Sequence, residues 1–154
     1  MSGSSKSVNP DPLKKRKPHP ELYKRNIIKH ARVKGDQHVN WKGRSVSARS
    51  TGPDCNCKMH CFRTLLQADF SLYITKLNGF NTKDEQDIYL QQLIEKKSIK
   101  SHRPRKGDLS IPREYSFKYF IDSSSKKQVV CKKAFCSIYG ITIARVKRLL
   151  KLKS

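Results

Sequence analysis

Three cysteines stand close together in the segment 55–61, which reads CNCKMHC. Cys55, Cys57 and Cys61 are close enough along the chain for their sulfur atoms to reach a single ion. In a reducing compartment a cluster of thiolates favours Zn²⁺, and a structural zinc site needs four ligands in a tetrahedron. The chain has five cysteines, and an odd number clustered in this way is not typical of a disulfide framework. The segment therefore predicts a zinc site with three local ligands and a fourth from elsewhere.

Cys131 is the fourth ligand that we predict, because it ends an expected strand directly before the last helices of the chain. His60 is a rival, although its position next to Cys61 makes joint ligation geometrically awkward. Cys136 is expected at a contact between helices and is therefore less available. Cysteines that are merely reduced or buried, with no metal, are the alternative reading. The predicted ligands of the ion are Cys55, Cys57, Cys61 and Cys131.

The closing segment 132–151, KKAFCSIYGITIARVKRLLK, has the pattern of a helix-turn-helix. Two helices that cross at a fixed angle need a small residue where they meet, a glycine in the turn and an apolar inner face. Cys136, Gly140 and Thr142 supply the small residue, the turn and the cap of the second helix. In this respect the segment resembles the helix-turn-helix of lac-repressor-type regulators. The expected inner faces carry Phe135 and Ile138, then Val146, Leu149 and Leu150.

The outer face of the second helix would contact DNA. Arg148 suits a guanine edge and Ile143 a thymine methyl group, whereas Lys147 and Lys151 suit phosphates. Arg145 lies toward the flank, where it also suits a phosphate. The alternative is a helical hairpin with a solvated basic face. The predicted DNA-binding residues are Ile143, Ala144, Arg145, Lys147, Arg148 and Lys151.

The charge of the chain also points to a polyanionic partner. Lys and Arg total 34 against 12 Asp and Glu, which gives a formal net charge of +22. Such an excess favours nucleic acid first and an anionic membrane surface second. The chain has no apolar run of the roughly 20 residues that span a bilayer, and its first residues lack the apolar stretch of a signal peptide. The basic run 14–17 suits a nuclear localisation signal, so we expect a nuclear protein.

The expected fold class is mainly α with a small β-hairpin (α+β), in one small domain over residues 20–154. A disordered basic tail over 1–19 precedes a basic helix and loop over 20–54. The Cys cluster and a helix pair follow over 55–97, with one helix through 62–77 and a second that begins with a Thr82–Glu85 capping box. A two-stranded hairpin over 113–131 and the helix-turn-helix over 132–152 complete the chain. The expected buried side of the second helix of the pair is Ile88, Leu90, Leu93 and Ile94.

The order of these motifs resembles the N-terminal part of uncharacterised, transposon-derived proteins of insects and other arthropods. The resemblance covers about residues 14–150 and depends on WKGRSVSA, the C-x-C-x3-C cluster and VCKKAFCSIYGITIARVKRLL. In that family an RNase-H-like transposase domain, or a relic of one, usually follows, and we expect this chain to lack it. The resemblance implies that Cys55, Cys57, Cys61 and Cys131 match recurring cysteines and that the last helices bind DNA. Cys136 departs from the apolar residue usual at its position.

The leading interpretation is therefore a zinc-stabilised module that binds duplex DNA without catalysis. No phosphate-binding glycine loop, Ser-His-Asp arrangement or convergent carboxylates are recognisable. An RNA-binding protein is the first alternative, in which Trp41, Tyr115, Phe117 and Tyr119 stack on unpaired bases. A protein-interaction adaptor that uses the helix pair at 62–96 is the second. A homodimer is possible, but no feature of the sequence supports one.

Overall fold

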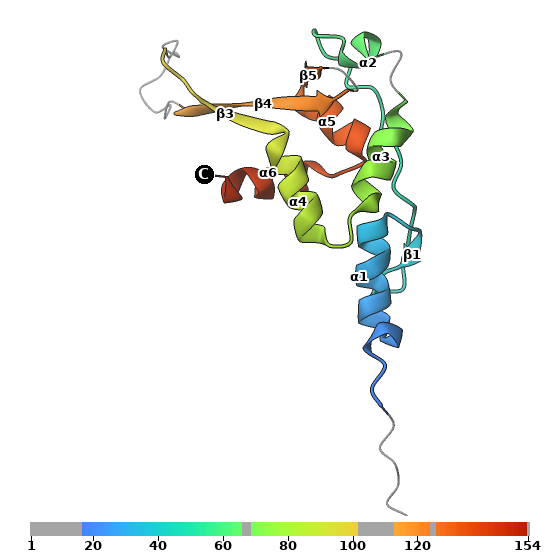
Figure 1. Ribbon diagram of the computed structural model, residues 1–154. Helices are drawn as coiled ribbons and strands as arrows, with labels where there is room; N and C mark the ends of the chain where they lie inside the picture. The colour runs from blue at the N-terminus through green and yellow to red at the C-terminus, as the bar shows by residue number, and fades with distance from the viewer. Residues whose placement is uncertain (1–16, 66–68, 102–112, 124–125, 154) are drawn as a thin grey trace, which may run out of the picture.

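The computed structural model describes residues 17–65, 69–101, 113–123 and 126–153. The predicted tail up to residue 16, most of the connection over 98–112 and two serines of the hairpin turn lie outside these ranges. The fold is predominantly helical with two small antiparallel sheets, so the predicted α+β class is confirmed (Figure 1). The elements are η1 (Pro20–Leu22), α1 (Lys24–Lys34), β1 (His38–Val39), β2 (Ser45–Val46), α2 (Cys61–Thr64), α3 (Phe70–Gly79), α4 (Lys83–Gln92), β3 (Ile94–Ser98), β4 (Tyr115–Asp122), β5 (Lys127–Val130), α5 (Lys132–Tyr139) and α6 (Ile143–Leu152).

The larger sheet has three strands in the order β3-β4-β5, where the sequence predicts only two. The additional strand, β3, comes from residues expected at the end of a helix. Ile94 pairs with Tyr119, and Tyr119 pairs with Val130 on its other side. Strand pairing at this long sequence separation therefore ends the helix earlier than its local pattern predicts.

The helix pair also differs in detail from its prediction. The single helix expected over 62–77 is two helices, α2 and α3, and Asp69 caps the second by accepting a hydrogen bond from the Ser71 N–H at 2.9 Å. Helix α4 begins with the predicted capping box, in which the Thr82 hydroxyl accepts from the Glu85 N–H at 3.2 Å. Ile88, expected on the buried side, is 57% exposed.

An aromatic cluster centred on Tyr139 holds α3, α4 and α5 together. Its ring centroid lies 5.9 Å from Tyr73 of α3 and 5.1 Å from Phe135 of α5. The Tyr89 hydroxyl of α4 lies 3.3 Å from the Tyr139 hydroxyl, which satisfies both polar groups within the core. Phe135 also packs on Tyr119 of the sheet at 5.5 Å, so α5 joins the helices to the strands.

Helices α1 and α3 approach each other with their C-terminal ends, as Figure 1 shows. The last carbonyl groups of a helix lack partners within it and carry the negative end of its dipole. The Gln86 amide donates to the Val33 carbonyl of α1 at 2.7 Å and to the Leu77 carbonyl of α3 at 2.8 Å. Arg49 donates to the Arg32 carbonyl at 3.1 Å and also to the Asn78 side chain. The side-chain donors of Gln86 and Arg49 therefore offset the repulsion between the two negative helix ends.

Among the described residues, no helix has both the length and the apolar character needed to cross a membrane.

Candidate metal centre and nucleic-acid interface

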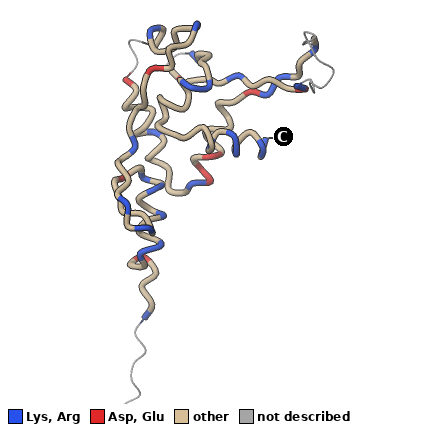
Figure 2. The backbone as a smooth tube through the Cα atoms, turned by 180° about the vertical axis from the view of Figure 1, so that it is seen from behind, with Lys and Arg blue, Asp and Glu red and all other residues tan. Residues whose placement is uncertain are grey.

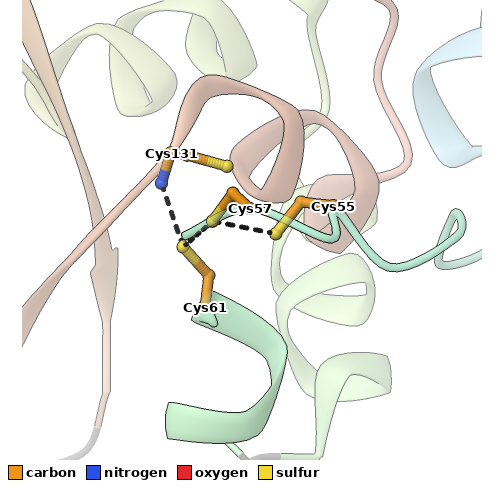
Figure 3. Close-up of side chains that lie close together, drawn as sticks. All are labelled: Cys55, Cys57, Cys61 and Cys131. Carbon is orange, nitrogen blue, oxygen red and sulfur yellow. Dashed lines mark hydrogen bonds between the residues drawn. The ribbon is translucent and has the colours of Figure 1, made fainter. Parts of the chain in front are cut away.

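The four predicted metal ligands come together at one point of the fold (Figure 3). The Sγ atoms of Cys55, Cys57, Cys61 and Cys131 all lie within 4.8 Å of one another. The Cys57 Sγ lies 3.4 Å from those of both Cys55 and Cys61. With metal–sulfur bonds of about 2.3 Å, the edge of a tetrahedral tetrathiolate site is about 3.8 Å. The cluster is therefore compatible with a structural metal ion.

Backbone turns bring the three local cysteines to one side of this cluster. Asn56 and His60 both have positive φ, at 44° and 46°, and the His60 N–H donates to the Cys57 carbonyl at 2.9 Å. Asn56 lies between Cys55 and Cys57, and the turn that ends at His60 lies between Cys57 and Cys61. His60 itself is exposed at the N-terminus of α2 and takes no part in the cluster. Cys136 is buried on α5 and also lies outside it, which agrees with the predicted choice of Cys131.

Cys131 closes the cluster from the N-terminal end of α5. Its Sγ accepts from the Ala134 N–H at 3.3 Å, and its own N–H donates to the Cys61 Sγ at 3.3 Å. These two bonds tie the Cys131 sulfur to the first turn of α5 and the Cys131 backbone to Cys61. Cys61 and Cys131 are 70 residues apart in the sequence. An ion at this position would therefore join α2 to the junction of β5 and α5.

The cluster contains thiols of unequal acidity. The Cys61 N–H, which donates to the Cys57 sulfur, lowers the pKa of Cys57 to about 6. Burial raises the pKa of Cys61 to about 12 and also raises the pKa of Cys55. All five cysteines are free thiols in the structure. Metal binding must therefore displace protons from the two buried thiols, because only thiolates ligate.

The predicted turn between the last two helices is present. Gly140 has φ 58° and ψ 39°, and a Cβ at this position would lie 2.6 Å from the Ser50 carbonyl oxygen. Glycine is thus required both by the left-handed backbone and by the segment that crosses the turn. The Thr142 hydroxyl caps α6 by accepting from the Arg145 N–H at 3.2 Å. Val146 and Leu149, one turn apart on the inner face of α6, are fully buried.

The predicted DNA-binding residues fall into two groups on α6. The side chains of Ile143, Ala144, Lys147 and Lys151 are exposed. Arg145, by contrast, is only 14% exposed and donates twice to Asp87 of α4, at 2.9 and 2.7 Å, and once to the Gln86 side chain at 3.1 Å. It therefore links α4 to α6, and its predicted phosphate contact competes with this role.

Arg148 also contacts Asp87, with a distance of 3.2 Å between its guanidinium and the second carboxylate oxygen. Its side chain is 47% exposed, so it is accessible at the surface as well. Figure 2 shows the acidic residues of α4 beside the C-terminal helix and the basic residues spread along α1. The sequence identifies neither Gln86 nor Asp87 as a partner of α6, because the residues that they contact there are about 60 positions away.

The four aromatic residues of the RNA-binding alternative do not form one exposed surface on which bases could stack. Tyr119 is 7% exposed and belongs to the core, while Phe117 is half-buried against it. Tyr115 is exposed and stacks with Lys96, whose Nζ lies 3.9 Å from the ring centroid. Trp41 lies apart from them in the turn between β1 and β2. A stacking surface on the larger sheet is therefore limited to Tyr115.

Comparisons with protein-family models, with curated proteins and with solved structures find no match to this chain.

Proposed function

We propose that this chain is a zinc-stabilised nuclear module of transposon origin that binds duplex DNA through α6 and acts without catalysis. The observation that carries the proposal is the two-sided character of α6. Its inner residues Val146 and Leu149 are completely buried, whereas Lys147 and Lys151 are exposed on the outer side and have no acidic partner among the described residues. A helix fixed in this way can enter a major groove as a rigid body.

Zinc is the ion that the cluster suits best. Four thiolates form a soft, closed ligand set, which zinc occupies as a structural ion rather than a catalytic one. The ion would fix the start of α5, and α5 in turn sets the position of the turn and of α6. The proposed metal therefore supports the proposed DNA-binding helix, although the two are separate claims.

Metal analysis of the purified protein tests the first claim. We expect one zinc ion per chain, lost in Cys61→Ala and retained in the matched control Cys136→Ala, whose buried thiol lies outside the cluster. A metal-free protein with an unchanged fold would refute a structural zinc.

Selection of binding sites from a pool of random duplexes tests the second claim. With about six phosphates neutralised, the logarithm of affinity should fall against the logarithm of salt concentration with a slope near −5. Arg148→Ala should relax the sequence preference, with a loss of about 1–3 kcal/mol on the selected site. Lys147→Ala should instead weaken binding to all duplexes alike and reduce the slope by about 1.

Lys127→Ala provides the matched control, because Lys127 is an exposed lysine of β5 on the larger sheet. Lys127→Ala lowers the net charge by the same amount as Lys147→Ala. It should nevertheless have a much smaller effect on duplex affinity and on the salt slope, and it should leave the sequence preference unchanged. Failure of the wild-type protein to bind duplexes at moderate ionic strength would contradict the proposal. An Arg148→Ala variant with an unchanged site preference would remove α6 as the recognition helix.

A further inference from the structure

A basic cleft of about 570 Å³ lies between α1, the β1–β2 turn and the first turns of α4 and α6. We propose that this cleft binds one unpaired nucleotide of a nucleic-acid strand, with the base against Trp41 and the phosphate on the cations of α1. The inference rests on the proposed function in one respect, which is that the ligand is a nucleic acid. The site is nevertheless separate from the outer face of α6.

The cations of α1 form one continuous row along the cleft. Lys24, Arg25, Lys29 and Arg32 line it and are exposed. Arg25, Lys29 and Arg32 follow one another at intervals of four and three residues, which places them on one helical face, and Lys24 adjoins Arg25. Over the described ranges none of them has a carboxylate partner, and no acidic residue lines the cleft. Unneutralised cations around a concave site are the electrostatic condition for capturing a phosphate group.

Trp41 is 73% exposed, although its indole is a large and mostly apolar ring. Its turn is held by the Asn40 side chain, which accepts from the Lys42 N–H at 2.9 Å and from the Arg44 N–H at 3.0 Å. Gly43 completes the turn with φ 80°. The indole is therefore carried by a well-bonded turn instead of being buried. An exposed aromatic ring beside cations is the arrangement on which proteins stack unpaired bases.

The remainder of the cleft suits a base and its phosphate in size and chemistry. Ile28 and Val33 are buried and give it an apolar floor. Gln86 and Arg145 also line it, and Arg145 is held by its bonds to the Gln86 side chain and to Asp87. Ligand pockets usually measure about 300–1,000 Å³, which includes this cleft. A base within a duplex is stacked on both sides, so only an unpaired or splayed base can reach the indole.

The chain contains a single tryptophan, so its intrinsic fluorescence reports directly on the cleft. The full-length, metal-loaded protein is titrated with a deoxythymidine octamer and with an abasic octamer that carries the same number of phosphates. We expect saturable quenching by the thymidine octamer and binding of the abasic octamer that is about 5- to 100-fold weaker, since stacking supplies the difference. Equal binding and equal quenching by the two octamers would overturn the assignment of the base.

Variants then locate the site through the anisotropy of a labelled octamer. Trp41→Ala should weaken binding by about 5- to 100-fold and Trp41→Phe by much less. The double variant Lys29→Gln/Arg32→Gln should reduce the salt slope by about 1.4. Its matched control is Lys118→Gln/Lys127→Gln, which loses the same charge from exposed positions on the larger sheet. Wild-type affinity in Trp41→Ala, with circular dichroism showing an intact fold, would overturn the proposal.

Three further ligands separate this inference from the proposed function and from other anions. If Trp41→Ala binds both duplex and octamer as the wild-type protein does, the proposed nucleotide site in the cleft is refuted and the proposed function stands. Octamer binding that requires Trp41, without any duplex binding, would support the cleft and refute the proposed function. Quenching by thymidine monophosphate at the same concentration as the octamer, or tighter binding to phosphatidylserine vesicles, would overturn the assignment to a nucleic-acid strand.

Discussion

Replacement of Gln86 by leucine should destabilise the protein far more than a surface substitution on the same helix. Gln86 is 1% exposed and uses both amide hydrogens on the carbonyl groups of Val33 and Leu77. These carbonyls belong to the final turns of α1 and α3, where the helices provide no donor. Leucine preserves the approximate volume but leaves both carbonyls without this partner and removes the acceptor of one Arg145 N–H.

The cost can be worked from the bonds that are lost. A buried polar group left unsatisfied costs about 1–3 kcal/mol. Two carbonyls together should therefore cost about 3–5 kcal/mol, if partial relaxation is allowed. Helices α1 and α3 also meet at the negative ends of their dipoles, so loss of the donor adds repulsion between them. In a chain of this size, 3–5 kcal/mol corresponds to a decrease of about 6–20 °C in Tm.

Urea unfolding of the metal-loaded protein, followed by far-ultraviolet circular dichroism, measures this difference. Tryptophan fluorescence is a poor probe here, because Trp41 is already largely exposed in the folded state. Gln92→Leu is the matched control, since Gln92 is exposed at the end of α4, and it should change stability by about 0.5 kcal/mol or less. A Gln86→Leu variant as stable as this control would refute the reasoning that Gln86 joins the two helix ends.

Three further perturbations address the link between α4 and α6, the turn and the metal site. Asp87→Ala should cost about 3 kcal/mol in urea unfolding because it leaves the largely buried Arg145 guanidinium without its carboxylate, whereas the exposed Asp84→Ala should cost less than about 1. Gly140→Ala should cost at least about 2 kcal/mol, because φ is 58° and the added Cβ would lie 2.6 Å from a carbonyl oxygen. Its control is Gly79→Ala, whose added Cβ would have no atom within 4 Å, so that this substitution should be neutral or stabilising. Zinc affinity should rise at least about 100-fold per pH unit between pH 7 and 8 in competition with a chromophoric chelator, because the two thiols whose pKa burial raises must each release a proton. Equal stability of either variant and its control, or a pH-independent zinc affinity, would contradict the corresponding argument.

Features with a local cause were predictable from the sequence. The Thr82–Glu85 capping box and the Gly140 turn depend on residues a few positions apart, and both are present. The Cys cluster required one long-range choice, and Cys131 was chosen because it ends an expected strand directly before the last helices. Thus local rules, together with the four-ligand requirement of zinc, were sufficient to place these residues.

Features with a non-local cause were missed. Strand β3 reads as a helix end, because Ile94 continues an apolar pattern and lysines follow it; pairing with Tyr119 overrides this preference. The break before α3 was hidden because apolar spacing continues across Asp69, which is the actual cap. Arg145 was predicted to contact a phosphate at the flank of the helix, because its actual partners on α4 are about 60 residues away and leave no local signal. Tertiary contacts thus decided the local preferences in each case.

The scarcity of carboxylates explains where this basic chain binds its own cations and where it leaves them free. Lys34 donates to the Phe80 carbonyl at 3.1 Å, and Lys153 donates to the Gln91 carbonyl at 2.8 Å. With Arg49 on the end of α1, these cations use helix C-termini as their negative partners. Within the described ranges, neither a helix C-terminus nor a carboxylate is bonded to Lys29 and Arg32 of the α1 cleft or to Lys147 and Lys151 on the outer face of α6. Because folding satisfies the first group internally, a polyanion should gain most from the second, and salt should weaken binding without unfolding the protein.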